Sequence, residues 1–188
     1  MLELINVQTA KPQYLRRLKR LYKQAFPWYE RKPWQLLRQT AARGRAEMLA
    51  VRDSRHNFCG LAICLFWQDI VLLDYLAVEP KQRSRGIGAQ IIPLLLQRYP
   101  QKRLLLESER PGAPYTNLAD CRRRLAFYQK CGLKNTGLTV QLYISEYLLL
   151  WSPGAEANTQ PPGFADYQNL YNGLFGELTA WRLNIREL

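Results

Sequence analysis

The sequence predicts an α/β fold: a central mixed, mostly antiparallel, twisted sheet of six to seven strands, flanked by about four helices and followed by a C-terminal helical tail. Apolar runs of strand length alternate along the chain with segments of helical periodicity. The 188 residues are 47% hydrophobic and 22% charged, which is typical of a globular domain with its own core. No apolar run approaches the ~20 residues of a membrane helix, and the first residues do not form a signal peptide, so we expect a cytoplasmic protein.

The first half of the chain is predicted to contain a strand, two helices and then three strands. Pro12 is well placed to open a helix, because its missing N–H is not needed in the first turn. Gly44 ends the second helix, and Gln68-Asp69 separates two long apolar runs, which indicates a hairpin. These elements are expected at residues 2–7, 12–26, 34–43, 46–53, 58–67 and 70–78.

The second half alternates helices with strands and ends in a linker and a tail. Pro93 lies inside a predicted helix and should bend it, and Gly132 stops the next helix. The expected elements are a helix at 86–100, a strand at 102–109, a helix at 118–132, two strands within 138–151 and a tail helix at 164–181. This order gives a largely antiparallel sheet with one parallel crossover.

The expected organisation is a main domain, a linker and an apolar tail. The domain spans residues 1–151, the Pro- and Gly-containing linker 152–163 and the tail 164–188. Six large apolar side chains of the tail repeat at helical spacing: Phe164, Tyr167, Leu170, Tyr171, Leu174 and Phe175. We therefore expect the tail to pack on the domain or on a second subunit of a homodimer.

Basic side chains are concentrated in the N-terminal third. The chain has 27 Lys and Arg against 15 Asp and Glu, and residues 11–55 hold 13 basic and 3 acidic side chains. Such a surface is typical both of solvated helix faces and of a field that attracts an anionic partner. Because the sequence has no RNP, KH or zinc-finger motif, we do not expect nucleic acid to be the partner.

Metal chemistry and histidine-based catalysis are not expected. The four cysteines, Cys59, Cys64, Cys121 and Cys131, form no CxxC pair, and His56 is the single histidine. A Ser-His or Cys-His triad is therefore hard to build, and small buried hydrophobes are the simplest role for the cysteines.

The segment with the strongest chemical signal joins a strand that ends at Val78 to a helix that begins near Gly86. The turn between them carries Lys81, Arg83 and Arg85, and Gly86 and Gly88 would let a ligand approach the backbone. Unpaired N–H groups and the helix dipole attract an anion there, such as a diphosphate. The segment lacks the lysine of a P-loop and the third glycine of a dinucleotide fingerprint. An ordinary glycine-capped turn is the alternative.

Two motifs in this sequence resemble those of the GNAT superfamily of N-acetyltransferases. Arg83-Ser84-Arg85-Gly86-Ile87-Gly88 is similar to the family's [QR]xxGx[GA] motif, which follows a strand ending in a triplet like Leu76-Ala77-Val78. RLAFYQKCGL at residues 124–133 is similar to the family's fYexxGF motif, with Leu133 replacing the last phenylalanine. The resemblance covers roughly residues 1–150. It implies a GNAT-like fold for an acetyltransferase domain at 1–151, with acetyl-CoA as cosubstrate and no metal.

The resemblance also assigns cofactor-binding positions. The backbone of Leu76, Ala77 and Val78 would hydrogen-bond pantetheine, and the Val78 N–H would polarise the thioester carbonyl and stabilise its oxyanion. The backbone amides of one continuous segment would hold the diphosphate: Arg83, Ser84, Arg85, Gly86, Ile87, Gly88 and Ala89.

Two residues would move the protons by the same resemblance. Tyr128 matches the tyrosine that protonates the departing thiolate, and packing in the core is its alternative role. Glu107 in LLLESE matches the glutamate base of ribosomal-protein alanine acetyltransferases, because the position used by the histone-acetylating branch is occupied by Leu72. An ion pair with an arginine is the alternative role for Glu107, and Asp74, Glu30 or a water chain are alternative bases.

The sequence therefore predicts an acetyl-CoA-dependent N-acetyltransferase that moves an acetyl group to a primary amine by direct transfer in a ternary complex. The acceptor would be a small molecule or a peptide, and the basic field would favour an acidic one. The alternative is a non-catalytic module of the same fold that binds a CoA species or a polyanion such as RNA.

Overall fold

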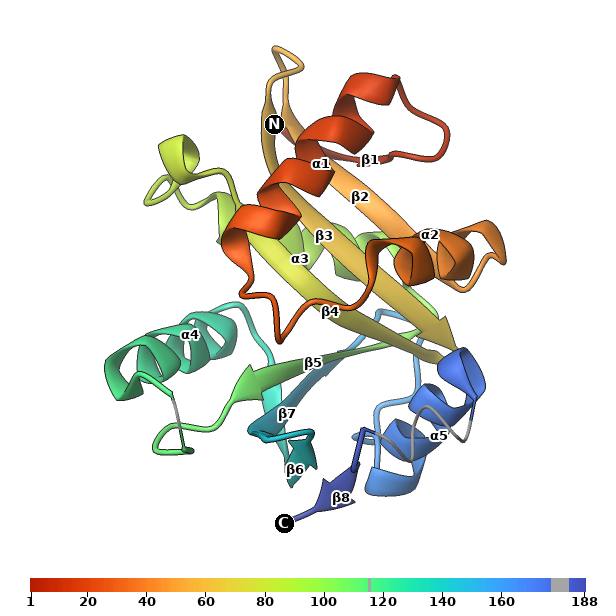
Figure 1. Ribbon diagram of the computed structural model, residues 1–188, viewed down its shortest axis with the longest axis vertical. Helices are drawn as coiled ribbons and strands as arrows, with labels where there is room; N and C mark the ends of the chain where they lie inside the picture. Colours follow the sequence, from red (N-terminus) through yellow and green to blue (C-terminus); the bar gives the residue numbers. More distant parts are fainter. Residues whose placement is uncertain (115, 177–182) are drawn as a thin grey trace. The chain divides into compact units, whose positions relative to one another are not determined.

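A computed structural model describes residues 1–114, 116–176 and 183–188 (Figure 1). The chain divides into two units. The first comprises residues 1–65 and 73–95, and the second comprises residues 66–72 and 96–188. The first two boundaries between the units fall within strands. One follows residue 65 in β3 (Phe58–Trp67), and the other precedes residue 73 in β4 (Ile70–Val78).

The first unit is built on antiparallel strands with helices on both faces. β1 pairs with β2, and β2 pairs with β3 through a register shift at Val51/Arg52. In Figure 1, α1 and α2 lie on one face of these strands and α3 lies on the other. The elements are β1 Leu2–Asn6, α1 Pro12–Ala25, α2 Trp34–Ala42, β2 Ala46–Asp53, β3 Phe58–Trp67, β4 Ile70–Val78, the short 3₁₀ helix η1 Pro80–Gln82, and α3 Ile87–Arg98.

The second unit begins with the parallel pair that the sequence predicts. The first residues of β4 pair parallel with β5, Ile70 opposite Arg103, and β5 then pairs antiparallel with β7. β6 pairs with β7 on one side and with the short β8 on the other, so the strand order is β4-β5-β7-β6-β8. The elements are β5 Arg103–Glu109, α4 Leu118–Lys130, β6 Lys134–Leu142, β7 Ser145–Pro153, α5 Phe164–Phe175 and β8 Arg186–Glu187.

The mixed, mostly antiparallel α/β fold is confirmed, with one correction to the strand count. The described residues contain eight strands instead of six to seven, and the additional strand is β8. A two-residue strand is too short to show the period-2 alternation by which strands are recognised. The described part of the tail helix ends at Phe175, and residues 177–182 of the prediction lie outside the described residues. The division at residues 151 and 163 stays a prediction.

The amphipathic pattern of α1 explains how the first unit covers its sheet. Leu18 and Leu21 of α1 and Leu37 of α2 are fully buried, and so are Leu49 of β2 and Leu61 of β3. The remaining positions of α1 turn their long basic side chains outward, as the helical spacing of its leucines requires.

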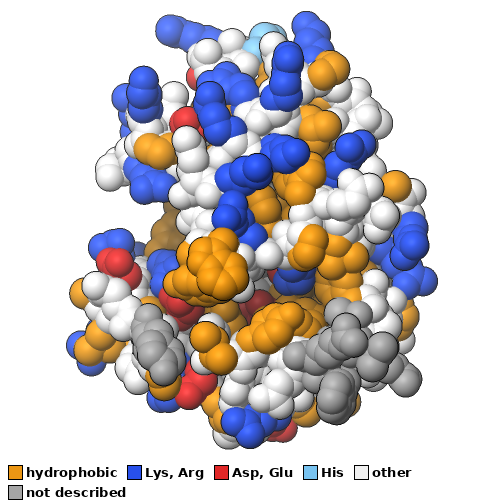
Figure 2. All heavy atoms as spheres, viewed as in Figure 1, with side chains coloured by type: hydrophobic (Ala, Val, Ile, Leu, Met, Phe, Trp, Pro, Cys, Tyr) orange, Lys and Arg blue, Asp and Glu red, His pale blue; other side chains and the backbone are white. Residues whose placement is uncertain are grey.

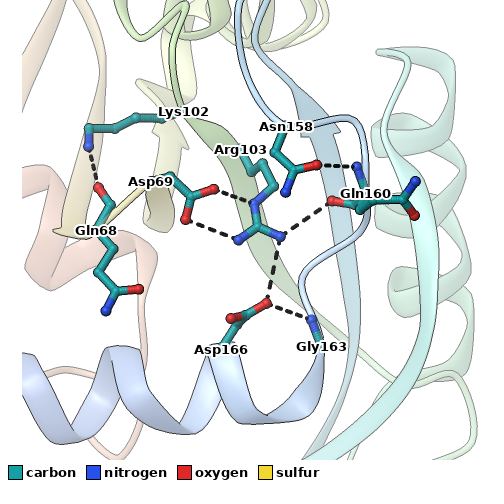
Figure 3. A network of polar contacts seen from close by, with 8 residues as sticks. All are labelled: Gln68, Asp69, Lys102, Arg103, Asn158, Gln160, Gly163 and Asp166. Atoms are coloured by element: carbon teal, nitrogen blue, oxygen red, sulfur yellow. Dashed lines mark hydrogen bonds and ion pairs between the residues drawn. The ribbon is translucent and has the colours of Figure 1, made fainter.

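A buried arginine connects three segments of the second unit (Figure 3). Arg103, the first residue of β5, is 6% exposed and donates two hydrogen bonds to the Asp69 carboxylate, at 2.8 and 3.0 Å. Its third nitrogen donates to the carbonyl of Gln160 at 3.4 Å and lies 3.6 Å from Asp166. Asp166 in turn accepts from the Gly163 N–H at 3.0 Å, which caps the start of α5. Arg103 therefore holds the β3–β4 turn, the linker and α5 together.

We expect Arg103→Met to destabilise the protein by about 2–4 kcal/mol, because it leaves two carboxylates without their partner while both remain partly hydrated. For a chain of this length that corresponds to a melting temperature lower by roughly 5–12 °C. Arg123→Met is the matched control, because Arg123 pairs with Asp120 on the open surface at 76% and 48% exposure. Equal melting temperatures for the two variants, by calorimetry, would contradict the role of Arg103.

Candidate functional site

The end of β4 presents the predicted triplet along one strand edge. Side chains alternate, so Leu76 and Val78 share a face and are partly exposed, while Ala77 points to the other face and is buried. Backbone of β3 lies very close by: a Cβ on Gly60 would stand 2.5 Å from the Ala77 carbonyl oxygen. Only glycine permits this approach. Gly60 was not among the predicted site residues, although an isolated glycine inside an apolar strand pattern is the signal that could have identified it.

The connection from β4 to α3 combines two positive φ angles with a helix N-terminus. Ser84 and Gly86 both have positive φ angles, 61° and 70°, just before α3 begins at Ile87. The first turn of α3 adds N–H groups that have no partner within the helix, and such groups attract anions. The seven predicted diphosphate residues, 83–89, and the triplet 76–78 therefore lie on one continuous strand–turn–helix connection.

Three basic side chains surround this turn. Lys81, Arg83 and Arg85 are exposed. Arg83 Nε donates to the Val78 carbonyl at 3.3 Å, and Arg85 donates to the Gln82 side chain at 3.1 Å. The turn is thus cationic in its side chains as well as in its backbone dipoles, which suits a ligand with several negative charges.

The loop between α1 and α2 is fixed to β4 by tyrosine hydroxyls. Tyr75 donates to the Glu30 carbonyl and accepts from the Lys32 N–H, both at 2.8 Å, and Tyr22 donates to the Lys32 carbonyl at 2.8 Å. Burial raises the pKa of Tyr22 to about 12 and raises the pKa of Tyr75 further, so both hydroxyls stay protonated at neutral pH. Both hydroxyls therefore form hydrogen bonds that hold the loop in place.

Asp74, one of the alternative bases, is buried beside this loop. Its side chain is 2% exposed and its Oδ1 lies 2.6 Å from Lys32 Nζ. Oδ2 is buried and has no hydrogen-bond partner among the described residues. Burial raises the pKa of the Asp74 carboxyl, and the Lys32 charge opposes that shift. A raised pKa makes a carboxylate a stronger proton acceptor, whereas pairing with Lys32 is typical of a structural ion pair.

In the second unit, Tyr128 lies near the end of α4, as its motif predicts. Its ring is partly exposed and lies 5.1 Å from the Phe127 ring, centroid to centroid. Burial of the hydroxyl raises the pKa of Tyr128, against the opposing effect of Arg124. The phenol is therefore protonated at neutral pH, as a proton donor must be.

Glu107, on β5 in the same unit, is held by the C-terminal helix. Its Oε1 accepts hydrogen bonds from the hydroxyls of Tyr167 at 2.8 Å and Tyr171 at 2.7 Å. Both tyrosines lie on α5 and are fully buried. Their periodicity predicted packing, but nothing in the sequence pointed to a polar contact with a residue 60 positions earlier. The predicted pairing of a β5 glutamate with an arginine occurs two residues further on, where Glu109 contacts Arg124.

The described residues contain neither a metal-binding cluster nor a membrane-spanning helix. Within residues 1–114, 116–176 and 183–188, no group of three or more His, Cys, Asp or Glu side chains could hold a metal ion. Cys59, Cys64 and Cys121 are buried and Cys131 is half-buried. No helix in this described part is both long and apolar enough to cross a bilayer.

Comparisons with known proteins identify the family. The model of the acetyltransferase (GNAT) family matches residues 15–133, and a search of curated proteins found no match. A putative GNAT-family acetyltransferase from Bacteroides thetaiotaomicron is similar in structure, with a TM-score of 0.68 and 19% identity over 94% of this chain and 98% of its own. A spermidine N-acetyltransferase from Vibrio cholerae, in complex with CoA and spermine, gives 0.65 and 12% over 82% and 96%.

At these identities the solved structures show a shared fold, and the family model carries the assignment. It spans more than half of the chain and includes both motifs that resemble GNAT sequences, from the β4 triplet to Leu133. The protein therefore belongs to the acetyltransferase (GNAT) family, and it is an N-acetyltransferase that uses acetyl-CoA.

Proposed function

We propose that the enzyme transfers an acetyl group from acetyl-CoA to a primary amine by direct transfer within a ternary complex. The observation that carries the proposal is the β4–α3 connection. This turn has two positive φ angles, carries basic side chains and leads into a helix N-terminus beside the exposed end of β4. In this proposal the amides of residues 83–89 bind the diphosphate of acetyl-CoA and the backbone of residues 76–78 binds pantetheine. The Val78 N–H then stabilises the oxyanion that forms when the amine attacks the thioester.

Two proton transfers complete the proposed reaction. The attacking amine loses a proton as the C–N bond forms, and the CoA thiolate gains one as the C–S bond breaks. We assign the donated proton to the Tyr128 hydroxyl, which burial keeps protonated. We assign the accepted proton to Glu107, because the two phenol donors on Oε1 keep its carboxylate ionised and fixed in orientation. The same donors lower its basicity, so in this proposal the proton reaches Glu107 through water.

The acceptor proposed here is an amine that also carries negative charge. Figure 2 shows Lys and Arg side chains gathered over α1. Five of them are exposed on this helix: Arg16, Arg17, Lys19, Arg20 and Lys23. Arg20 has one acidic neighbour, Glu79, at 3.8 Å. Such a field attracts an acidic amine or an acidic peptide and repels a polyamine such as the spermine bound by the Vibrio cholerae enzyme.

The proposed function is tested by measuring CoA thiol release from acetyl-CoA with a panel of amines. The panel contains acidic peptides with free N-termini, amino acids, spermidine and aminoglycosides, each at low and high salt. We expect the acidic amines to react and their kcat/KM to fall as salt screens the α1 field. Turnover of spermidine in preference to every acidic amine would contradict the proposed acceptor class, and release without any amine dependence would contradict direct transfer.

Replacing the two candidate carboxylates separately is expected to distinguish the base. Glu107→Gln should lower kcat by about 100-fold and remove the acidic limb of the rate–pH profile, with acetyl-CoA affinity unchanged. Asp74→Asn should leave that limb in place and instead lower the melting temperature, because it leaves Lys32 without its carboxylate. An intact acidic limb in Glu107→Gln together with its loss in Asp74→Asn would transfer the base assignment to Asp74.

A further inference from the structure

The C-terminal helix delivers two hydroxyl groups to one carboxylate oxygen. Tyr167 and Tyr171 are one helical turn apart on α5, their rings meet edge to face at 5.2 Å, and both hydroxyls donate to Glu107 Oε1. Residues four apart on a helix share a face, so one face of α5 carries both donors. Such convergence of two buried phenols on a single oxygen is more than packing requires, since phenylalanine would fill the same volume.

The rest of α5 is fixed tightly enough to hold these hydroxyls in place. Its first turn is capped by Asp166, which also lies 3.6 Å from the buried Arg103. Near its other end, a Cβ on Gly173 would overlap the Trp67 ring, so the helix backbone lies directly against that ring. Both contacts lie within the second unit, the unit that also contains Glu107. A helix that is held at both ends keeps its side chains in place, so Tyr167 and Tyr171 can orient Glu107 without a large entropic cost.

The direction of the hydrogen bonds determines their chemical effect. Burial and the nearby Glu107 charge raise the pKa of Tyr167 well above its ordinary value, so Tyr167 remains the donor. Two donors on one oxygen stabilise the ionised form of a carboxylate, and hydrogen bonds to charged groups are about twice as strong as neutral ones. They also fix the plane of the carboxylate, because Oε1 cannot leave either phenol without losing a hydrogen bond.

We propose that Tyr167 and Tyr171 are positioning residues for acetyl transfer, which hold Glu107 ionised and correctly oriented, so that α5 is a functional part of the enzyme. This inference rests on the proposed role of Glu107 as proton acceptor. The helix lies beyond residues 15–133, which the family model matches. The two tyrosines therefore lie outside the part of the chain that the family model matches.

The expected consequence is a change in proton transfer with no change in cofactor binding. Tyr167→Phe and Tyr171→Phe should each lower kcat about tenfold, and the acidic limb of the rate–pH profile should move to higher pH, because an anion with fewer donors is easier to protonate. Tyr147 of β7 also acts on Tyr167, and Glu109, two residues along β5 from Glu107, is paired with Arg124. Acetyl-CoA affinity and its KM should remain within about twofold of the wild type.

Two controls separate positioning from stability. Tyr14→Phe removes one part-buried hydroxyl, which donates to the His56 carbonyl at 3.2 Å, without touching α5. Leu170→Ala loosens the buried face of α5 and keeps both hydroxyls. We expect neither control to move the acidic limb, even where Leu170→Ala lowers the melting temperature more than the phenylalanine variants do.

The experiment combines steady-state kinetics across pH, acetyl-CoA calorimetry and thermal melting for Glu107→Gln, the two phenylalanine variants and both controls. Loss of the limb in Glu107→Gln and its shift in the phenylalanine variants alone would support the inference. A wild-type profile in both phenylalanine variants, with an impaired Glu107→Gln, would overturn this inference and leave the proposed function standing. A wild-type Glu107→Gln would refute the proposed base, and the positioning role with it.

Discussion

Replacing Gly86 or Gly88 with valine is expected to weaken acetyl-CoA binding by tenfold to a hundredfold, which is about the value of one hydrogen bond to a charged group or more. The two substitutions reach this result by different routes. Gly86 has a φ of 70°, which a β-branched residue adopts only with strain, and apart from the adjacent residues no described atom lies within 4 Å of where its Cβ would stand. Gly88 lies inside α3, where valine takes a helical backbone, so its side chain is expected to act by obstructing the proposed diphosphate.

The matched control for backbone strain is Gly44→Val. Gly44 has a φ of 71° and equally open surroundings, but it lies in the turn between α2 and β2. Its valine variant should lose stability to the same extent as Gly86→Val and bind acetyl-CoA normally. Arg83→Ala should weaken binding only a few-fold, because the backbone supplies most of the proposed contacts. If calorimetry finds wild-type acetyl-CoA affinity in both Gly86→Val and Gly88→Val, the proposed binding of the diphosphate at this turn is wrong.

Local chemistry is the part of this molecule that the sequence predicted well. The helical spacing of Leu18 and Leu21, with arginines and lysines between them, predicts which face of α1 is buried, and both leucines are fully buried. The glycines and basic residues between Val78 and Ala89 predict a strand–turn–helix connection, and the positive φ of Gly86 is the conformation for which glycine is suited. In both cases the information lies within a few residues of the position concerned.

Contacts between distant segments could not be predicted in the same way. Arg103 reaches Asp69, Gln160 and Asp166, and each of these carboxylates or carbonyls could equally have faced water. Glu107 meets Tyr167 and Tyr171 only because α5 folds back onto β5. A tyrosine on an apolar helix face has the same periodicity whether its hydroxyl meets a carboxylate or solvent. The motif thus pointed to Glu107 as the candidate base, whereas its hydrogen bonds could be seen only in the folded structure.

Tyr128→Phe is expected to lower kcat by at least tenfold, and up to about 1,000-fold, with little change in the KM for acetyl-CoA. The phenol is proposed to give its proton to the CoA thiolate as the C–S bond breaks, and phenylalanine has no proton to give. Burial raises the pKa of Tyr128 above its ordinary value near 10, so the acid stays loaded at every pH below that value. The wild-type rate should therefore not fall between pH 7 and about 10 through ionisation of this group.

The raised pKa of Tyr128 also predicts how the stability of the protein depends on pH. A phenol with a raised pKa in the folded state favours folding below the unfolded pKa, and this contribution is lost as the pH rises through the folded pKa. Wild type should therefore lose stability relative to Tyr128→Phe only above about pH 10, while the two melt alike near neutrality. Tyr143→Phe, which removes an exposed phenol in the same unit, is the kinetic control. An unchanged kcat in Tyr128→Phe would assign Tyr128 to packing on α4 and leave the thiolate to take its proton from water.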